Sequence, residues 1–211
     1  MAKILCIYPK DTTIDFLDVV YQKICSMDGA IGLEGTPVED DDYFEKLEKS
    51  IQDVQIVCFL GHGSSSSLYG PHDNPLICKE NGNMELLKGK TLYLDACKSA
   101  DYIAEYHLNS AIGFGFMPTS LDDARNGNLH KLEINELLDE DIDYFVKAKN
   151  NVWLKTIDSV GFESPKKFFS MFRFYTNKEI VDCLINGSTK HYRIVADMLY
   201  YLKEDMSFVC S

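Results

Sequence analysis

The sequence predicts an α/β fold in which helices cover both faces of a mostly parallel central sheet, with extra helices in the C-terminal half. Three observations support this prediction. Short apolar runs alternate with helical patterns along the first half of the chain. The runs are apolar throughout rather than at every second residue, as in strands buried on both faces of a parallel sheet. The chain has 211 residues, 45% of them hydrophobic, which is enough for one sizeable core.

The predicted strands are the apolar runs of the first half. Three of them are strong: Ile4–Tyr8, Val54–Leu60 and Thr91–Ala96. Ala30–Leu33 is a weaker candidate, which a Gly-Thr-Pro turn closes. Ala111–Met117 is a further strand, and its glycines mark places where two backbones can approach closely.

Amphipathic patterns between these strands predict helices. Asp11, Thr12 or Thr13 is expected to cap the first helix. Its apolar face would consist of Ile14, Leu17, Val20, Tyr21 and Ile24. Asp40–Asp42 supply the acidic first turn of a second helix, which suits the positive end of the helix dipole. Ser99–Asn109 is expected to form a third helix.

The second half of the chain is predicted to be mainly helical. Leu129–Val146 has apolar residues at helical spacing, and Asn151–Asp158 fits either a helix or a strand. Ser164-Pro165 combines a cap with a proline at the first helical position, and opens a phenylalanine-rich helix. The loop Thr119–Asn128 is expected to be the most flexible stretch.

Two more helices are predicted near the C-terminus. Thr176 or Asn177 would cap a short one that ends at Asn186-Gly187, and Ser188 would begin the last one. We therefore predict a single domain over residues 1–211. Its core strands and motifs would lie in residues 1–120, and its helical insertion and closing helices in residues 121–211.

The net charge and the cysteines of the chain limit the partners and the cell compartment that can be expected. The net charge of −12 argues against nucleic acid as a partner, because the phosphate backbone requires clustered Lys and Arg. It slightly favours cationic ligands, although a solvated acidic surface is the commoner explanation. No run approaches the ~20 apolar residues of a membrane helix. Seven scattered cysteines without a Cys-x-x-Cys pair are typical of a reduced, cytoplasmic protein.

Two predicted strands end in reactive side chains. "CFLGHG" delivers His62 and "LYLDAC" delivers Cys97. In a parallel sheet both would lie at the edge formed by the carboxyl ends of the strands, where ligands bind. A histidine that takes the proton of a nearby cysteine creates a thiolate nucleophile, which is the chemistry of acyl transfer through a thioester. Taken alone, each residue is more often structural; the pairing of the two strand ends favours catalysis.

The glycines that flank His62 fit the same interpretation. Gly63 leaves its backbone N–H uncovered, so that it can stabilise a developing oxyanion together with the N–H of Cys97. Gly61 would let the chain turn sharply at the end of the strand.

Asp95 lies two residues before Cys97, so alternation along a strand places the two side chains on one face. A carboxylate beside a thiol disfavours the thiolate. The arrangement makes sense if Asp95 instead faces an adjacent pocket and pairs with a cationic substrate group. The alternative is that Asp95 caps the helix that begins near Ser99.

An apolar strand that ends in His-Gly, followed by one that ends in Ala-Cys, resembles the caspase-like cysteine peptidases. "FLGHGSSSSLYG" and "LYLDACKSA" are most similar to the CHAT and clostripain-like branch of the group that includes caspases, gingipains and separase. The resemblance covers roughly residues 1–120, and it is loose beyond Met117. It implies a caspase-like three-layer sandwich.

By this resemblance, His62 and Cys97 would form the catalytic dyad, with Gly63 and Cys97 in the oxyanion hole. Asp95 would line a pocket that favours cleavage after Arg or Lys. The implied function is a hydrolase, a thiol endopeptidase of protein or peptide substrates, which a partner or signal activates in a bacterial regulatory or defence system. No cofactor is implied beyond a reduced thiol, and the sequence gives no sign of calcium dependence.

Other interpretations remain open. The chain could be a non-catalytic caspase-like module that binds a partner as an adaptor or inhibitor, although it retains both His62 and Cys97. A metal-dependent hydrolase would use these two with Asp95 and His72-Asp73, but no ligand pair has helical or zinc-knuckle spacing. His107, His130 and His191 are expected at the surface. If the enzyme cuts after basic residues, Arg125 marks a candidate self-cleavage site.

Overall fold

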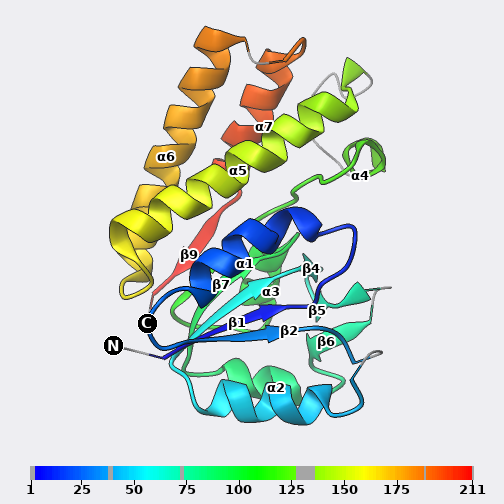
Figure 1. Ribbon diagram of the computed structural model, residues 1–211, viewed down its shortest axis with the longest axis vertical. Coiled ribbons are helices and arrows are strands. Elements are labelled where there is room, and N and C mark those ends of the chain that lie inside the picture. The colour runs from blue at the N-terminus through cyan, green and yellow to red at the C-terminus, as the bar shows by residue number, and fades with distance from the viewer. Residues whose placement is uncertain (1–2, 38–39, 72–73, 127–135, 188, 211) are drawn as a thin grey trace. The chain divides into compact units, whose positions relative to one another are not determined.

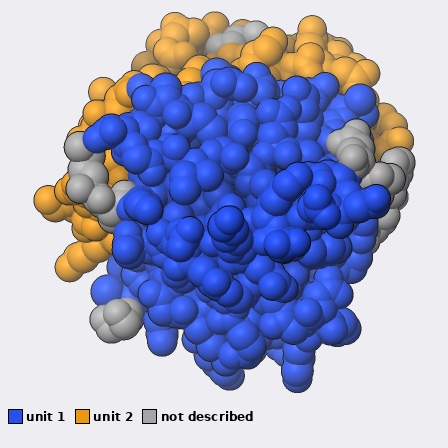
Figure 2. Space-filling view, turned by 60° about the horizontal axis from the view of Figure 1, so that its bottom comes forward, with its two compact units in different colours: residues 1–115, 207–211 blue, residues 116–206 orange. Residues whose placement is uncertain are grey.

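The computed structural model describes residues 3–37, 40–71, 74–126, 136–187 and 189–210 (Figure 1). The chain forms two compact units, which Figure 2 colours separately. Unit 1 comprises Met1–Gly115 and Ser207–Ser211, and unit 2 comprises Phe116–Met206. Unit 1 contains both predicted motif strands.

Unit 1 is built on a six-stranded sheet with the order β2-β1-β3-β7-β8-β9. The strands are β2 (Ala30–Glu34), β1 (Ile4–Tyr8), β3 (Ile56–Leu60), β7 (Thr91–Asp95), β8 (Ala111–Gly113) and β9 (Ser207–Val209). The first five are parallel, and β9 pairs antiparallel with β8. The strand predicted at Ala111–Met117 is real but shorter, whereas the weak candidate at Ala30 is confirmed.

Helices cover both faces of this sheet, as predicted. α2 (Tyr43–Gln52) and α3 (Ser99–Glu105) pack apolar side chains against one face, where Leu5, Val57 and Leu92 belong to the same core. α1 (Asp18–Cys25) lies on the opposite face (Figure 1). There the ring of Tyr21 is 5.0 Å from that of Tyr8 on β1. Unit 1 is therefore a three-layer α/β sandwich, and the predicted fold class is confirmed.

The first helical segment begins later than the capping prediction placed it. A short 3₁₀ turn, η1 (Asp15–Leu17), precedes α1, and its N-cap Ile14 makes no side-chain capping hydrogen bond. Asp11 and Thr13 are therefore not helix caps. Their side chains hydrogen-bond to each other and to His62 instead.

A second, three-stranded antiparallel sheet follows β3. It consists of β4 (His62–Gly63), β5 (Ser67–Tyr69) and β6 (Pro75–Cys78), with β5 in the middle. A 3₁₀ segment, η3 (Asn83–Leu87), then leads towards β7. The serine run after His62 thus supplies the turn of a hairpin, in which Ser64 N–H donates to the carbonyl of Ser67.

Unit 2 is helical, with α4 (Leu121–Asn126), α5 (Asp139–Val160), α6 (Pro165–Asn186) and α7 (Tyr192–Glu204). Its core includes Trp153 of α5, whose ring lies 5.1 Å from that of Phe168 on α6. Ser164 caps α6 by accepting from Lys167 N–H, with Pro165 at the first position, as predicted. Gly187 ends α6 in the left-handed conformation, with a φ of 57°.

For Asn151–Asp158 the structure decides between the two alternatives: the segment is helical, because it belongs to α5. Three other predictions for unit 2 need correction. α6 does not restart at Thr176: the Thr176 hydroxyl donates to the carbonyl of Phe172 within one continuous helix. The loop Thr119–Asn128 contains α4. The helix predicted from Leu129 begins at Asp139, while residues 127–135 and Ser188 lie outside the described residues.

The described segments contain no helix that is both long enough and apolar enough to cross a membrane.

Candidate active site

The predicted catalytic residues leave the sheet at neighbouring positions. Leu60, the last residue of β3, pairs with Asp95, the last residue of β7. The N–H of Gly61 extends this pairing by donating to the Asp95 carbonyl over 3.1 Å. His62 lies two residues after Leu60, and Cys97 lies two residues after Asp95. Both therefore leave the carboxyl edge of the sheet side by side, as the sequence predicted.

Close packing explains the glycines beside His62. A methyl group at residue 63 would lie 2.8 Å from the Cys97 carbonyl oxygen and 2.9 Å from Cβ of Ala96. One at residue 61 would lie 2.9 Å from the Phe59 ring. Neither glycine has a positive φ. The prediction that Gly61 is needed for a sharp turn is therefore wrong, because its backbone conformation does not require glycine. Both positions lack space for a side chain, and Gly63 packs directly on the backbone of Cys97.

The hairpin leaves the N–H of Gly63 directed away from its partner strand. Because Ser64 N–H donates to Ser67, these two residues form a hydrogen-bonded pair of the antiparallel ladder. Gly63 and Leu68 are the next pair. Hydrogen-bonded and non-bonded pairs alternate in such ladders, so Gly63 belongs to a non-bonded pair. Its N–H is therefore not used by β5, as an oxyanion donor requires.

Cys97 lies in a tight turn between β7 and α3, and it is half-buried. The next residue, Lys98, adopts the left-handed conformation, with a φ of 56° that is uncommon outside glycine. Buried Ser99 fixes the turn: its hydroxyl donates to the Leu94 carbonyl and accepts from the N–H of Phe114. The backbone around Cys97 is thus held by both neighbouring strands.

The imidazole of His62 contacts the loop that follows β1. Its Nε2 is 2.8 Å from Oγ1 of Thr13 and 3.1 Å from Oδ2 of Asp11. The His62 side chain is 35% exposed and that of Asp11 is 16% exposed. A substrate can therefore reach the histidine, while the carboxylate is largely shielded.

Asp11 is held in its ionised form. Burial by itself would raise the pKa of this carboxyl group, but hydrogen bonds from the hydroxyl and the N–H of Thr13, with the charge of His62, outweigh it. The net effect lowers the pKa of Asp11. A carboxylate therefore faces His62 at neutral pH.

Asp95 lies on β7 with only 1% of its surface exposed. A substrate side chain could reach it only after the surrounding residues move. The alternative role as a helix cap is not supported, because the N-cap of α3 is Lys98 and no side chain caps that helix.

The remaining histidines give a mixed outcome. His107 is exposed, as predicted. His191 is not a free surface residue: its Nδ1 is 2.9 Å from Oδ2 of the buried Asp141. His130 and the His72-Asp73 pair lie outside the described residues. Within the described part of the chain, no group of three or more His, Cys, Asp or Glu side chains is arranged to hold a metal ion.

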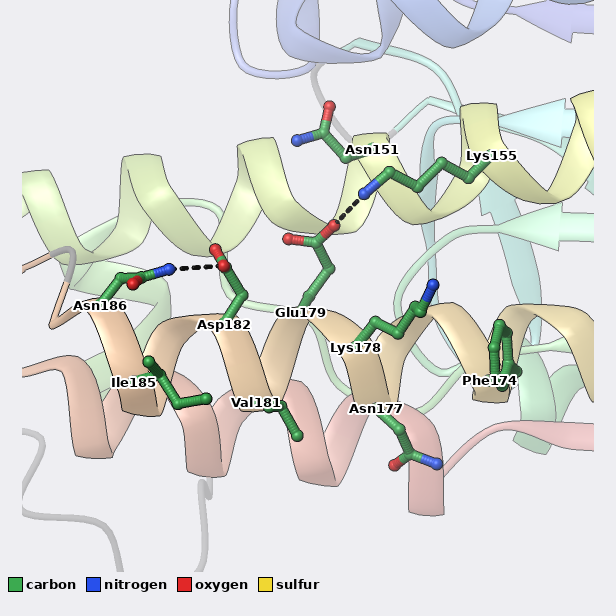
Figure 3. Close-up of a pocket in the computed structure, with 10 residues that line it drawn as sticks. All are labelled: Asn151, Lys155, Phe174, Asn177, Lys178, Glu179, Val181, Asp182, Ile185 and Asn186. Carbon is green, nitrogen blue, oxygen red and sulfur yellow. Dashed lines mark hydrogen bonds and ion pairs between the residues drawn. The ribbon is translucent and has the colours of Figure 1, made fainter.

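A pocket of about 730 Å³ lies in unit 2, between residues of α5 and α6 (Figure 3). Asn151 and Lys155 of α5 form one side, and Lys155 is paired with Glu179 of α6 over 2.6 Å. The other side consists of α6 residues: Phe174, Asn177, Lys178, Val181, Asp182, Ile185 and Asn186. No cysteine or histidine lines it, so size alone does not identify the reactive site.

The comparison with known proteins finds no matching family model, no matching curated protein and no matching solved structure. The similarity to caspase-like peptidases therefore rests on the short motifs around His62 and Cys97.

Sequence reasoning missed Asp11 and Thr13 as contacts of the histidine. A signal was present, because both lie in the short segment that follows the first predicted strand, Ile4–Tyr8. The missing information was the strand order: β1 pairs with β3, so the loop after β1 lies beside the end of β3. Short polar residues such as Asp and Thr are also common helix caps, so the sequence alone favoured a cap over a contact with His62.

Proposed function

We propose that this chain is a cysteine endopeptidase that cleaves protein or peptide substrates after Arg or Lys through a Cys97–His62 dyad. The observation that carries the proposal is the register of β3 and β7. It brings the ends of both motif strands together and packs Gly63 on the backbone of the cysteine. All seven cysteines lie among the described residues and are free thiols. The enzyme would act in a reducing compartment such as the cytoplasm, where Cys97 stays a thiol.

The reaction begins when Cys97 gives its thiol proton to His62 and its sulfur bonds to the scissile carbonyl carbon. The carbonyl oxygen becomes an oxyanion, which the N–H groups of Gly63 and Cys97 stabilise. The carbon–nitrogen bond then breaks, and the leaving amine takes the proton from His62. A thioester remains on Cys97.

Water completes the cycle. It gives a proton to His62 while its oxygen attacks the thioester carbon. The carbon–sulfur bond breaks, the proton returns to sulfur, and the substrate leaves as a carboxylic acid. The cycle requires a reduced thiol and no cofactor.

Asp95 is proposed to select the basic residue before the cut by pairing with its charge. Because Asp95 is buried, the pocket has to open before a substrate side chain reaches it. This need for opening supports activation by a partner or signal. Arg125 is a poor self-cleavage site in this state, because it lies inside α4.

Fluorogenic peptides that differ only in the residue before the cut (Arg, Lys, Asp or Leu) test the proposal under reducing conditions. We expect cleavage after Arg and Lys by the wild type and none by Cys97→Ala. Cys210→Ala, at an exposed cysteine, is the matched control and should remain active. Equal activity in Cys97→Ala would reject the peptidase. No cleavage by wild type, with Cys97 inert to thiol-reactive probes, would favour the partner-binding module.

A further inference from the structure

We propose that Asp11 and Thr13 are positioning residues that keep a hydrogen on Nε2 of His62, so that Nδ1 is the nitrogen that exchanges a proton with Cys97. That Cys97 is the group with which Nδ1 exchanges a proton rests on the proposed function. The assignment of the hydrogen to Nε2 rests only on the contacts of the three side chains.

The hydroxyl of Thr13 has one hydrogen, and the acceptor of this hydrogen is Asp11. Thr13 Oγ1 donates to Oδ1 of Asp11, which as a carboxylate can only accept. Towards His62, Thr13 Oγ1 therefore acts as an acceptor. Oδ2 of the same carboxylate, 3.1 Å from Nε2, is a second acceptor. Two acceptors face Nε2, so that nitrogen carries a hydrogen.

This conclusion holds in both charge states of the ring. A neutral imidazole has one N–H, and the two acceptors place it on Nε2. An imidazolium has an N–H at both nitrogens, and the one on Nε2 still donates to the same oxygens. The proton that enters and leaves the ring is therefore the one on Nδ1. Within the described part of the chain, Nδ1 has no hydrogen-bond partner of its own.

The loop after β1 holds the two acceptors in place. The N–H of Thr13 donates to Oδ1 of Asp11 over 2.6 Å, and the N–H of Ile14 donates to the Asp11 carbonyl over 3.2 Å. The Tyr8 hydroxyl, at the end of β1, donates to the Ile14 carbonyl. The acceptors are thus attached to the central sheet next to β3. Such support fixes the orientation as well as the protonation of a catalytic histidine.

A purely structural role for this loop is the competing explanation, because Asp11 and Thr13 also form a local turn. The two explanations differ in what the hydroxyl of Thr13 does. Thr13→Val keeps the shape of the side chain but removes the acceptor, whereas Thr13→Ser retains it. A structural role predicts similar behaviour of both variants, and a positioning role predicts rescue by serine.

The test combines ring-nitrogen NMR of ¹⁵N-histidine-labelled full-length protein with peptide cleavage. We expect the Nε2–H form of neutral His62 in the wild type and in Thr13→Ser, and a mixture of both neutral forms in Asp11→Ala and Thr13→Val. The kcat for an Arg peptide should fall at least about tenfold in the last two variants with little change in KM. Asp11→Asn, which keeps an acceptor oxygen, should retain the Nε2–H form. The neighbouring Thr12→Val is the matched control and should behave as wild type.

The two readouts separate the two proposals. An Nδ1–H form in the wild type, or unchanged ring shifts in Thr13→Val and Asp11→Ala, would overturn the positioning role even if the protein cleaves peptides. Absence of cleavage by the wild type would overturn the proposed function, while the ring shifts would still decide the role of Asp11 and Thr13.

Discussion

Each of the two units contains a cysteine and a His–Asp pair, and the two groups differ in burial. In unit 1, half-buried Cys97 follows β7, and His62 follows the neighbouring strand β3, contacts Asp11 and is partly open to solvent. In unit 2, Cys183 donates its thiol hydrogen to the Tyr192 carbonyl over 3.2 Å. The adjacent His191 is paired with Asp141 over 2.9 Å.

Burial gives the two groups different chemistry. Cys183 and Asp141 are both 0% exposed. Burial raises the pKa of Cys183 to about 11, and the nearby charges of Asp182 and Asp141 act in the same direction. Its thiol therefore stays protonated at neutral pH and is no nucleophile. The same residue types thus make a structural joint between α5, α6 and α7 in one unit and a candidate active site at the edge of a sheet in the other.

Replacing Cys97 and Cys183 one at a time is the strongest test of the difference between the two groups. Cys97→Ala should lower kcat/KM for an Arg peptide by at least about 10³-fold, because it removes the attacking sulfur. Cys183→Ala should leave kcat/KM unchanged and lower the free energy of unfolding by about 1 kcal/mol through the lost packing. Peptide cleavage and urea unfolding measure the two effects. The comparison fails if Cys183→Ala is the inactive variant.

Asp141→Ala tests the structural group. Breaking a buried pair should lower the free energy of unfolding by about 3 kcal/mol at pH 7. Asp143→Ala, at an exposed position on the same helix, is the control and should cost little. Urea unfolding of both variants measures the difference, and equal costs would contradict the role of Asp141.

The cost at Asp141 should depend on pH in a definite direction. Burial would raise the pKa of Asp141, but hydrogen bonds from the Leu138 N–H and from His191 outweigh it, and the net pKa is lowered. The stabilisation is therefore complete above the unfolded pKa of about 4 and is lost as the pH falls further. The difference between wild type and Asp141→Ala should shrink below about pH 4. A difference that stays constant down to pH 2 would contradict this account.

Asp95→Ala sharpens the comparison in unit 1. It should lower kcat/KM for Arg and Lys peptides by about 10- to 100-fold, because the charge that pairs with the substrate is lost. A Leu peptide should be affected little. Asp101→Ala, at an exposed position on α3, is the control for a general change of charge. An unchanged Arg preference in Asp95→Ala would remove Asp95 from the pocket.

A smaller effect on cleavage is expected at Gly63. Gly63→Ala would place a methyl group 2.8 Å from the Cys97 carbonyl, and we expect a loss of about 1–2 kcal/mol in stability together with reduced cleavage. A methyl group at Gly70, beyond the same hairpin, would make only ordinary contacts at 3.4–3.5 Å. Gly70→Ala should therefore be nearly neutral by urea unfolding, and equal costs at both positions would contradict the close approach of Gly63 to Cys97.

Much of unit 1 could be predicted because its signals are local. The apolar runs that became β1, β3 and β7 are buried apart from Thr91 at the start of β7, and the two motif residues follow the ends of β3 and β7. Such continuous runs identify parallel strands without knowledge of their neighbours. The pairing of Leu60 with Asp95 then confirmed that both strand ends lie at one edge.

The errors arose where tertiary contacts decide between two local explanations. Asp11 and Thr13 suit a helix cap by composition, but the position of β1 beside β3 directs them to His62. Thr176 also suits a cap, but its hydroxyl is satisfied within α6, so the helix continues. The burial of Asp95 and the pairing of His191 likewise depend on contacts that no sequence periodicity records.

The central claim is that Cys97 of unit 1, and not the buried Cys183 of unit 2, is the reactive cysteine; mapping a covalent adduct tests it most directly. The protein would be treated with a peptide chloromethyl ketone that ends in Arg, and the modified cysteine identified by mass spectrometry. We expect a single adduct on Cys97 that is lost in His62→Ala, with Cys183 unmodified. An adduct on Cys210 or Cys183 instead, or one on Cys97 that forms equally without His62, would contradict the account.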